Sequence, residues 1–288
     1  MVQVQESELR AQAYDSSIKA IAERMYKFKQ ALSLSTTAAW INTFYRETTT
    51  SALAGQAGTA IRASPRLSQP ARNSVDWARI DTYQEKYFFE DEIAWEDVIT
   101  NQINVQGRTL FRISEGVTSA VDSAIYSALT NVTGETDINQ VNLAQNIAWD
   151  LTSAAIIDDL GQARQLIAQD DIDATELIAF VSPKDMRSIN TYIAGKGAQF
   201  PQLGTEAATN GKVGKLNGIT FVMANAVTAS QCLIVVPKLC AEWKEAAPLQ
   251  TNTTEDPFRS IKIRAVEIGV THITQPKAIC LIRGTQSY

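Results

Sequence analysis

The sequence is short of the residues on which several classes of protein depend. It contains one histidine and three cysteines, and its longest conspicuous apolar run extends only from Cys232 to Val236. A single histidine nearly excludes a histidine-based metal site. The cysteines form no Cys-x-x-Cys pair and are expected to be small buried thiols. A bilayer span needs about 18 or more apolar residues, and the polar N-terminal residues do not resemble a secretory signal. We therefore expect no metal and no membrane partner.

The motifs of common catalytic and nucleotide-binding sites are also absent or incomplete. No Gly-x-Ser-x-Gly elbow occurs. Val213 follows Gly211-Lys212 where a Walker loop needs Ser or Thr, and Phe200 stands where a dinucleotide fingerprint needs glycine. The lone His272 has the strand phase of Ile268, which predicts a half-buried strand histidine. We expect no catalytic residue and no cofactor.

The charge of the chain argues against a protein whose main work is to grip nucleic acid. The net charge is −5 and the isoelectric point is about 5.1, whereas such proteins usually carry a basic surface that displaces counterions from phosphates. A protein that only surrounds nucleic acid has no such requirement. Hydrophobic and charged contents of 45% and 20% are ordinary for a globular protein.

Apolar periodicity predicts an α+β chain without regular β-α alternation. Helices are expected over residues 8–32, about 106–131, 143–170 and 183–195, the last with Ser182 as its N-cap. Strands are expected over 75–89, 177–181, 220–227, 232–236, 242–248, 260–271 and 278–282. A hairpin turn is expected at Asn217-Gly218. The apolar phase changes near Ala265, which we interpret as a β-bulge.

Residues 48–74 differ in composition from the rest of the chain. They are small, polar and poor in core-forming side chains, so they predict a long loop or arm. Residues 51–80 contain four arginines and one aspartate, net +3, whereas residues 81–100 contain seven acids and one lysine, net −6. Head-to-tail self-association would use such a pattern. The candidate interface residues are Arg62, Arg66, Arg72, Glu90, Asp91 and Glu92.

This order of parts resembles the Hong Kong 97 type major capsid fold of tailed double-stranded DNA phages and related viruses. The resemblance includes the segment from Asp256-Pro257-Phe258 to Arg264 and the closing Gln275-Pro276-Lys277. It implies an N-terminal arm (1–47) with an amphipathic helix and an extended loop (48–90). It also implies a peripheral domain with spine helix and sheet (91–142 and 251–288) and an axial domain (143–250).

The resemblance further implies a function without enzymatic activity. The chain would self-assemble into pentamers and hexamers of an icosahedral shell around double-stranded DNA, without sequence-specific contact. A portal protein and scaffolding or decoration proteins would be further partners, in a virion assembled in the host cytoplasm. Two alternatives stay open: an encapsulin-type nanocompartment of the same fold, and a carboxylate-dependent enzyme built on the acidic run at residues 90–97.

Overall fold

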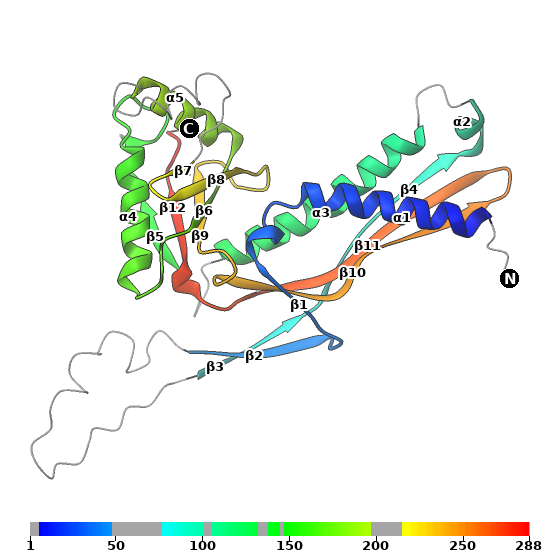
Figure 1. Cartoon of the computed structure of the whole chain (residues 1–288), viewed down its shortest axis with the longest axis horizontal. Coiled ribbons are helices and arrows are strands. Elements are labelled where there is room, and N and C mark those ends of the chain that lie inside the picture. Colours follow the sequence, from blue (N-terminus) through cyan, green and yellow to red (C-terminus); the bar gives the residue numbers. More distant parts are fainter. Residues whose placement is uncertain are drawn as a thin grey trace, which may run out of the picture.

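The computed structural model describes residues 6–47, 77–100, 105–131, 138–144, 147–196 and 215–287, and Figure 1 shows their arrangement. A four-stranded sheet with two long helices occupies one end of the molecule, and a six-stranded sheet with two shorter helices occupies the other. A two-stranded hairpin forms a third sheet. Both larger sheets combine strands from distant parts of the chain.

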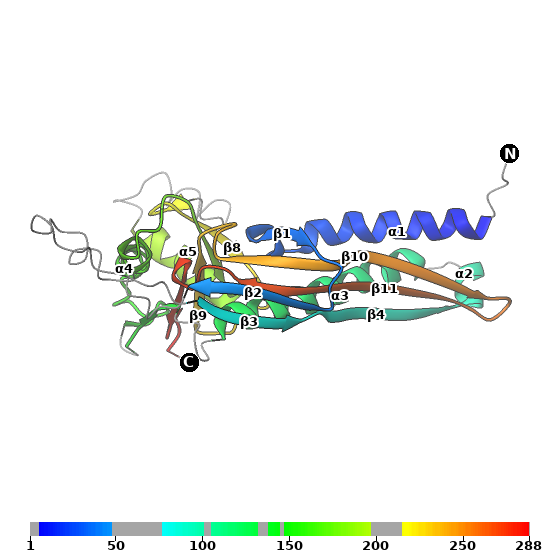
Figure 2. The ribbon, with the colours of Figure 1, turned by 90° about the horizontal axis from the view of Figure 1, so that it is seen from below.

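The four-stranded sheet is built on one long antiparallel hairpin. Its strands, in spatial order, are β1 (Ser33–Thr36), β10 (Ala241–Asp256), β11 (Ser260–Ile273) and β4 (Glu85–Ala94). β1 runs parallel to β10, and β4 runs antiparallel to β11. Because β4 is the last strand in this order, it forms an edge of the sheet. The helices α1 (Glu6–Met25) and α3 (Val105–Thr130) lie along the same face of this sheet (Figure 2).

An apolar stripe on α3 explains this packing. Side chains three and four residues apart share one helix face, and Ile113, Val117 and Val121 are fully or almost fully buried. On β11, alternate residues from Ile261 to Gly269 face the helices and are buried. The other face of β11 is half-exposed, since the helices cover only one side of the sheet.

The six-stranded sheet carries the second part of the core. Its strands, in spatial order, are β5 (Asn139–Asn142), β12 (Ile279–Arg283), β9 (Gln231–Val235), β6 (Leu177–Val181), β8 (Ile219–Met223) and β7 (Lys215–Leu216). The helix α4 (Ile156–Gln169) packs on β5 and β12. Ser182 caps α5 (Pro183–Gly195) by accepting a hydrogen bond from the Asp185 amide, which confirms the predicted helix start.

The remaining elements are short, apart from the hairpin. The hairpin joins β2 (Ile41–Glu47) to β3 (Trp77–Tyr83). The others are η1 (Lys29–Ala31), α2 (Trp95–Thr100) and η3 (Pro276–Ala278). The predicted Asn217-Gly218 turn joins β7 to β8, and both residues have positive φ, 54° and 80°, as a type I′ turn requires.

The first helix is shorter than expected. It ends at Met25 instead of continuing to residue 32, because the Asp122 carboxylate of α3 binds the backbone amides of Lys27 and Phe28. These bonds take the amides out of the helical ladder. Phe28 nevertheless remains buried and stacks on Phe180, with ring centroids 4.1 Å apart.

Three other expectations were wrong in detail. The helix predicted over 143–170 begins only at Ile156, and residues 75–89 contain parts of two strands that meet at Gln84. Strand β11 pairs with β4 without interruption through Ala265, so no bulge lies there. The register shifts lie instead on β10, between Glu245 and Gln250. The apolar phase changes along β11 because apolar residues lie on both faces of the strand. The half-exposed face carries Val266, Ile268 and Val270.

The expected domain boundaries do not coincide with the sheets. β2 and β3 pair with each other, although they were assigned to the arm and the extended loop. β4 belongs to the four-stranded sheet, although residues up to 90 were assigned to the loop. Residues 251–288 divide between the two large sheets, because β12 pairs with β5 and β9.

Candidate interaction surfaces

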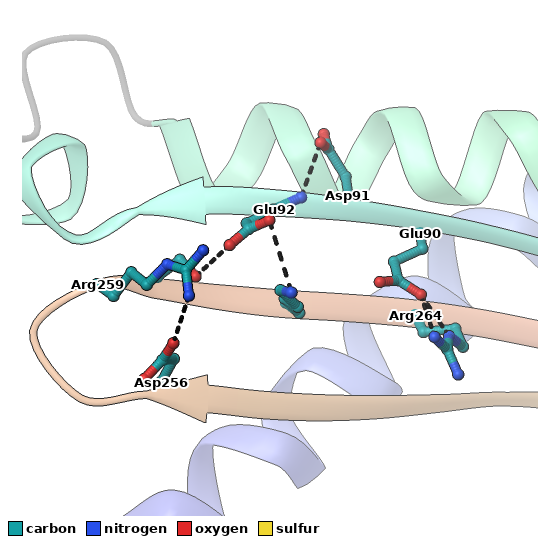
Figure 3. Close-up of polar contacts among 8 residues, drawn as sticks. Glu90, Asp91, Glu92, Asp256, Arg259 and Arg264 are labelled. Carbon is teal, nitrogen blue, oxygen red and sulfur yellow. Dashed lines mark hydrogen bonds and ion pairs between the residues drawn. The ribbon is translucent and has the colours of Figure 1, made fainter.

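The acidic run expected to receive an arm lies on the edge strand β4. Alternate residues of a strand point to opposite faces. Figure 3 accordingly shows Glu90 and Glu92 directed toward β11, while Asp91 points to the side on which α3 lies. The three carboxylates therefore do not form one cluster. In the part of the chain that the structure describes, no group of three potential ligands could hold a metal ion.

Glu90 is already paired within the chain. It stands directly opposite Arg264 of β11, and Arg264 Nε donates to its Oε2 over 2.6 Å (Figure 3). Both side chains are partly exposed. Exposed pairs of this kind contribute about 0 to 1 kcal/mol to stability. Any cation from outside would join this pair or compete with it.

Glu92 has a similar arrangement one step along the strand. It accepts a hydrogen bond from the Ser260 hydroxyl, and Lys262 Nζ lies 3.8 Å from its Oε2. The bond from Ser260 lowers the pKa of the Glu92 carboxyl. Asp91 accepts only from the amide of Glu92, and among the described residues no cation forms an ion pair with it. The expected interface arginines Arg62, Arg66 and Arg72 lie outside the described residues.

The β2–β3 hairpin presents an aromatic face that the sequence reasoning missed. In its register Ile41 lies opposite Tyr83, and Trp77 and Tyr45 share the same face. All four side chains are at least half exposed, between 50% and 64%. Large exposed apolar patches on soluble proteins usually mark interaction sites. The available signal was the pair of aromatic residues Trp77 and Tyr83, which have the same strand phase.

The opposite face of the hairpin is seated on the end of β11. Phe44 stacks on His272 with ring centroids 4.6 Å apart, and the Thr82 hydroxyl bonds to His272 Nε2. His272 is buried rather than half-buried. Burial and the nearby Lys244 lower its pKa to about 4. A neutral imidazole thus anchors the hairpin, and no described residue covers the aromatic face of the hairpin.

A second exposed apolar group lies at the far tip of the four-stranded sheet. Phe258, in the β10–β11 turn, is 79% exposed and makes an edge contact with Trp95 of α2. Ile99, also on α2, is 60% exposed. The backbone of Phe258 has φ of 60°, a conformation that bulky residues rarely adopt. The tip and the hairpin together provide two separated apolar surfaces.

The N-terminal arm is held on the long sheet by buried charges. Lys29 donates to Glu267 over 2.7 Å and to Glu245 over 2.9 Å, and Tyr26 donates to Glu267. Burial lowers the pKa of Lys29, but the two carboxylates outweigh it and the pKa lies above its usual value. Nothing in this cluster resembles a nucleophile and its base, and the cluster serves attachment.

The three cysteines behave as the sequence predicts. All are free and buried, and burial raises the pKa of each thiol. No described helix is long and apolar enough to cross a membrane. The hairpin face and the sheet tip are the strongest candidates for function, because they expose large apolar side chains on regular elements of the fold.

Comparison with known proteins agrees with this emphasis on surfaces. A model of a phage capsid protein family matches residues 78–282, which is more than half of the chain. A search of curated proteins found no match.

Solved structures share the fold at low sequence identity. The capsid of the cyanophage P-SCSP1u has a TM-score of 0.68 at 12% identity, covering 90% of this chain and 88% of that one. The mature capsid of bacteriophage PhiM1 has a TM-score of 0.60 at 18% identity, covering 90% and 86%. A virus-like particle from Pyrococcus furiosus has a TM-score of 0.62 at 10% identity, covering 95% and 99%.

Proposed function

The chain belongs to the phage capsid protein family, and from this premise we propose how its copies build a shell. They associate into pentamers and hexamers of an icosahedral shell that encloses double-stranded DNA. The observation that carries the proposal is the β2–β3 hairpin, whose aromatic face has no partner within the described chain. A second copy that covers Tyr45 and Trp77 would bury that face.

A second proposed contact joins the arginines of one copy to the carboxylates of β4 in a neighbouring copy. We propose that Arg62, Arg66 and Arg72 of one copy approach the β4 edge of a neighbour. Glu90 and Glu92 would then each interact with an arriving arginine as well as with their own partners, Arg264 and Lys262. Asp91 points to the other side of the sheet, so an arginine would have to pass the edge of β4 to contact it. Such networks favour the correct orientation of partners more than they add affinity.

The domain assignment of the proposal follows the sheets. The arm comprises α1, η1 and β1, and the extended loop runs from β2 to β3. The peripheral domain contains β4, the spine helix α3, β10 and β11, and the axial domain contains the six-stranded sheet. The copies act as structural subunits without enzymatic activity. Assembly takes place in the host cytoplasm, with a portal protein and scaffolding or decoration proteins as partners and without sequence-specific DNA contact.

Electron microscopy of the purified protein tests the proposal. We expect the wild-type chain to form closed particles, and Tyr45→Ser/Trp77→Ser to remain a folded but unassembled protein. Met223→Ser is a matched control, since Met223 is 51% exposed but lies on β8, away from the hairpin. A wild-type protein that stays monomeric at high concentration, or a hairpin variant that still forms particles, contradicts the proposal. The nanocompartment alternative is not favoured, because the matching family model is that of a phage capsid protein.

A further inference from the structure

A pocket beside α5 lies in the axial half of the molecule. It has a volume of about 600 Å³. Its wall includes one face of α5, since residues three or four apart on a helix share a face. The lining residues on which the argument depends are Asp150, Lys184, Arg187, Tyr192, Lys196 and Gln286.

The pocket is a built feature with cationic walls. Asp150 accepts two hydrogen bonds from Ser287, which fixes the C-terminal segment beside the pocket. Gln286 is 6% exposed and donates to the buried Asp185. These contacts hold two of the lining residues, Asp150 and Gln286, in place.

The charges of the pocket are not balanced. Lys184, Arg187 and Lys196 are exposed cations, and Asp150 is the exposed carboxylate among the described lining residues. The hydrogen bond from the Ser287 hydroxyl lowers the pKa of the Asp150 carboxyl, and the attraction of Lys184 adds a smaller effect in the same direction. The pocket therefore retains an excess of positive charge.

An acidic turn of matching charge lies at the other end of the same sheet. The connection from α4 to β6 contains no lysine or arginine and carries four exposed acids: Asp170, Asp171, Asp173 and Glu176. Asn139 binds Asp170, Thr175 binds Asp173, and Arg164 also attracts Asp173. These contacts hold the turn in one shape but leave most of its charge exposed.

The topology places the two features on opposite sides of this half of the molecule. The pocket residues follow β5, β6 and β12, which run parallel, whereas the turn directly precedes β6. The helix α4 connects the two ends and has 14 residues, so it spans about 21 Å. Figure 1 shows α5 near one end of α4, at the side of the molecule away from the β10–β11 turn.

From this placement we propose that the acidic turn of one copy enters the α5 pocket of the next copy around a ring. A contact between two different patches is heterologous, and it forms a ring when the rotation that relates neighbouring copies closes. Like-to-like pairing is disfavoured, because two pockets or two turns would bring equal charges together. The inference rests on the proposed function and assigns to this contact the closure of pentamers and hexamers.

Charge reversal tests the contact in the full-length chain. Arg187→Glu/Lys196→Glu and Asp170→Lys/Glu176→Lys should each raise the protein concentration needed for assembly by about tenfold or more at low salt. The combined variant should recover most of this loss. Lys215→Glu/Lys238→Glu is the matched control, because it changes the net charge equally at exposed positions on other parts of the same half. Circular dichroism should show unchanged melting for every variant.

A cross-link gives an independent readout. The native cysteines are all buried, so Arg187→Cys/Glu176→Cys should form a ladder of linked chains up to the ring size under oxidising conditions. Each single cysteine variant should not form this ladder. Assembled double variant without a ladder, or a pocket reversal that assembles like wild type, overturns the inference. A wild-type protein that never assembles counts instead against the proposed function.

Discussion

Lys29 Nζ lies 2.7 Å from Oε1 of Glu267, a carboxylate with no exposed surface. The two residues are 238 positions apart in the sequence. Lys29 belongs to η1 in the N-terminal arm, and Glu267 belongs to β11 of the long hairpin. Their contact attaches the arm to the sheet through a charge pair that is almost wholly removed from water.

Removing the cation should cost much of the stability of the fold. Lys29→Met leaves Glu267 buried without its counter-charge, and we expect a loss of about 3 kcal/mol in the free energy of unfolding. Lys19→Met is the control, because its pair with Asp15 is exposed and should contribute about 0.5 kcal/mol or less. Urea unfolding of the unassembled proteins measures both. Equal losses for the two variants would show that burial of the pair is unimportant.

Asp122 should make the fold more stable in mild acid. Burial raises the pKa of this carboxyl to about 6, although the amides of Lys27 and Phe28 oppose the change. The folded state therefore binds a proton that the unfolded state, with its lower pKa, has already released. Stability from this group is present below about pH 4 and declines as the pH rises through 6.

The measurement compares wild type with Asp122→Asn. The difference in unfolding free energy should favour wild type more at pH 4 than at pH 7, by about 2 kcal/mol. Asp173→Asn should show little change over this range, because the Thr175 hydroxyl lowers the pKa of Asp173 and the stability from that group is lost only as the pH falls below about 4. A pH-independent difference for Asp122→Asn would contradict the assigned role.

Gly269 of β11 is required by the ring of Trp243. A Cβ at Gly269 would lie 2.3 Å from Cζ2 of this fully buried indole, so Gly269→Ala should overpack the core and cost about 1 to 3 kcal/mol. Gly195→Ala is the matched control, since no described residue lies within 4 Å of its Cβ position. As the last residue of α5, it should be neutral or slightly stabilising. Thermal melting distinguishes the two.

The assembled shell should contain no covalent links between copies. The Hong Kong 97 type shells that form isopeptide bonds begin them from a lysine of the extended loop. Residues 48–85 contain no lysine, Lys86 lies only at the root of the loop, and arginine is effectively always protonated. Boiling in detergent should therefore release only monomer on a denaturing gel. A ladder of multimers without added oxidant would refute this expectation.

The arm arginines should act on assembly and not on folding. Replacing Arg62, Arg66 and Arg72 by glutamate should raise the protein concentration required for assembly steeply at low salt, because every copy both gives and receives one arm. The melting of the unassembled protein should stay nearly unchanged. Normal assembly of the triple variant would mean that apolar contacts hold the arm.

Much of the fold could be predicted from the sequence, because local patterns carry it. The period of α3, the cap at Ser182 and the Asn217-Gly218 turn depend on neighbours in the chain, and each was located correctly. The scarcity of histidine, paired cysteines and long apolar runs directed attention to surfaces. The family resemblance came from the order of these parts, and the family model agrees with it.

The rest depended on contacts between residues distant in sequence. The end of α1 is determined by Asp122, nearly a hundred residues away, and the pairing of Glu90 with Arg264 spans 174 positions. No local period records such contacts, since the free energy of a cap or an ion pair depends on the partner that the fold supplies. For the same reason the exposed face of the hairpin and the α5 pocket became visible only when the strands were placed in their sheets.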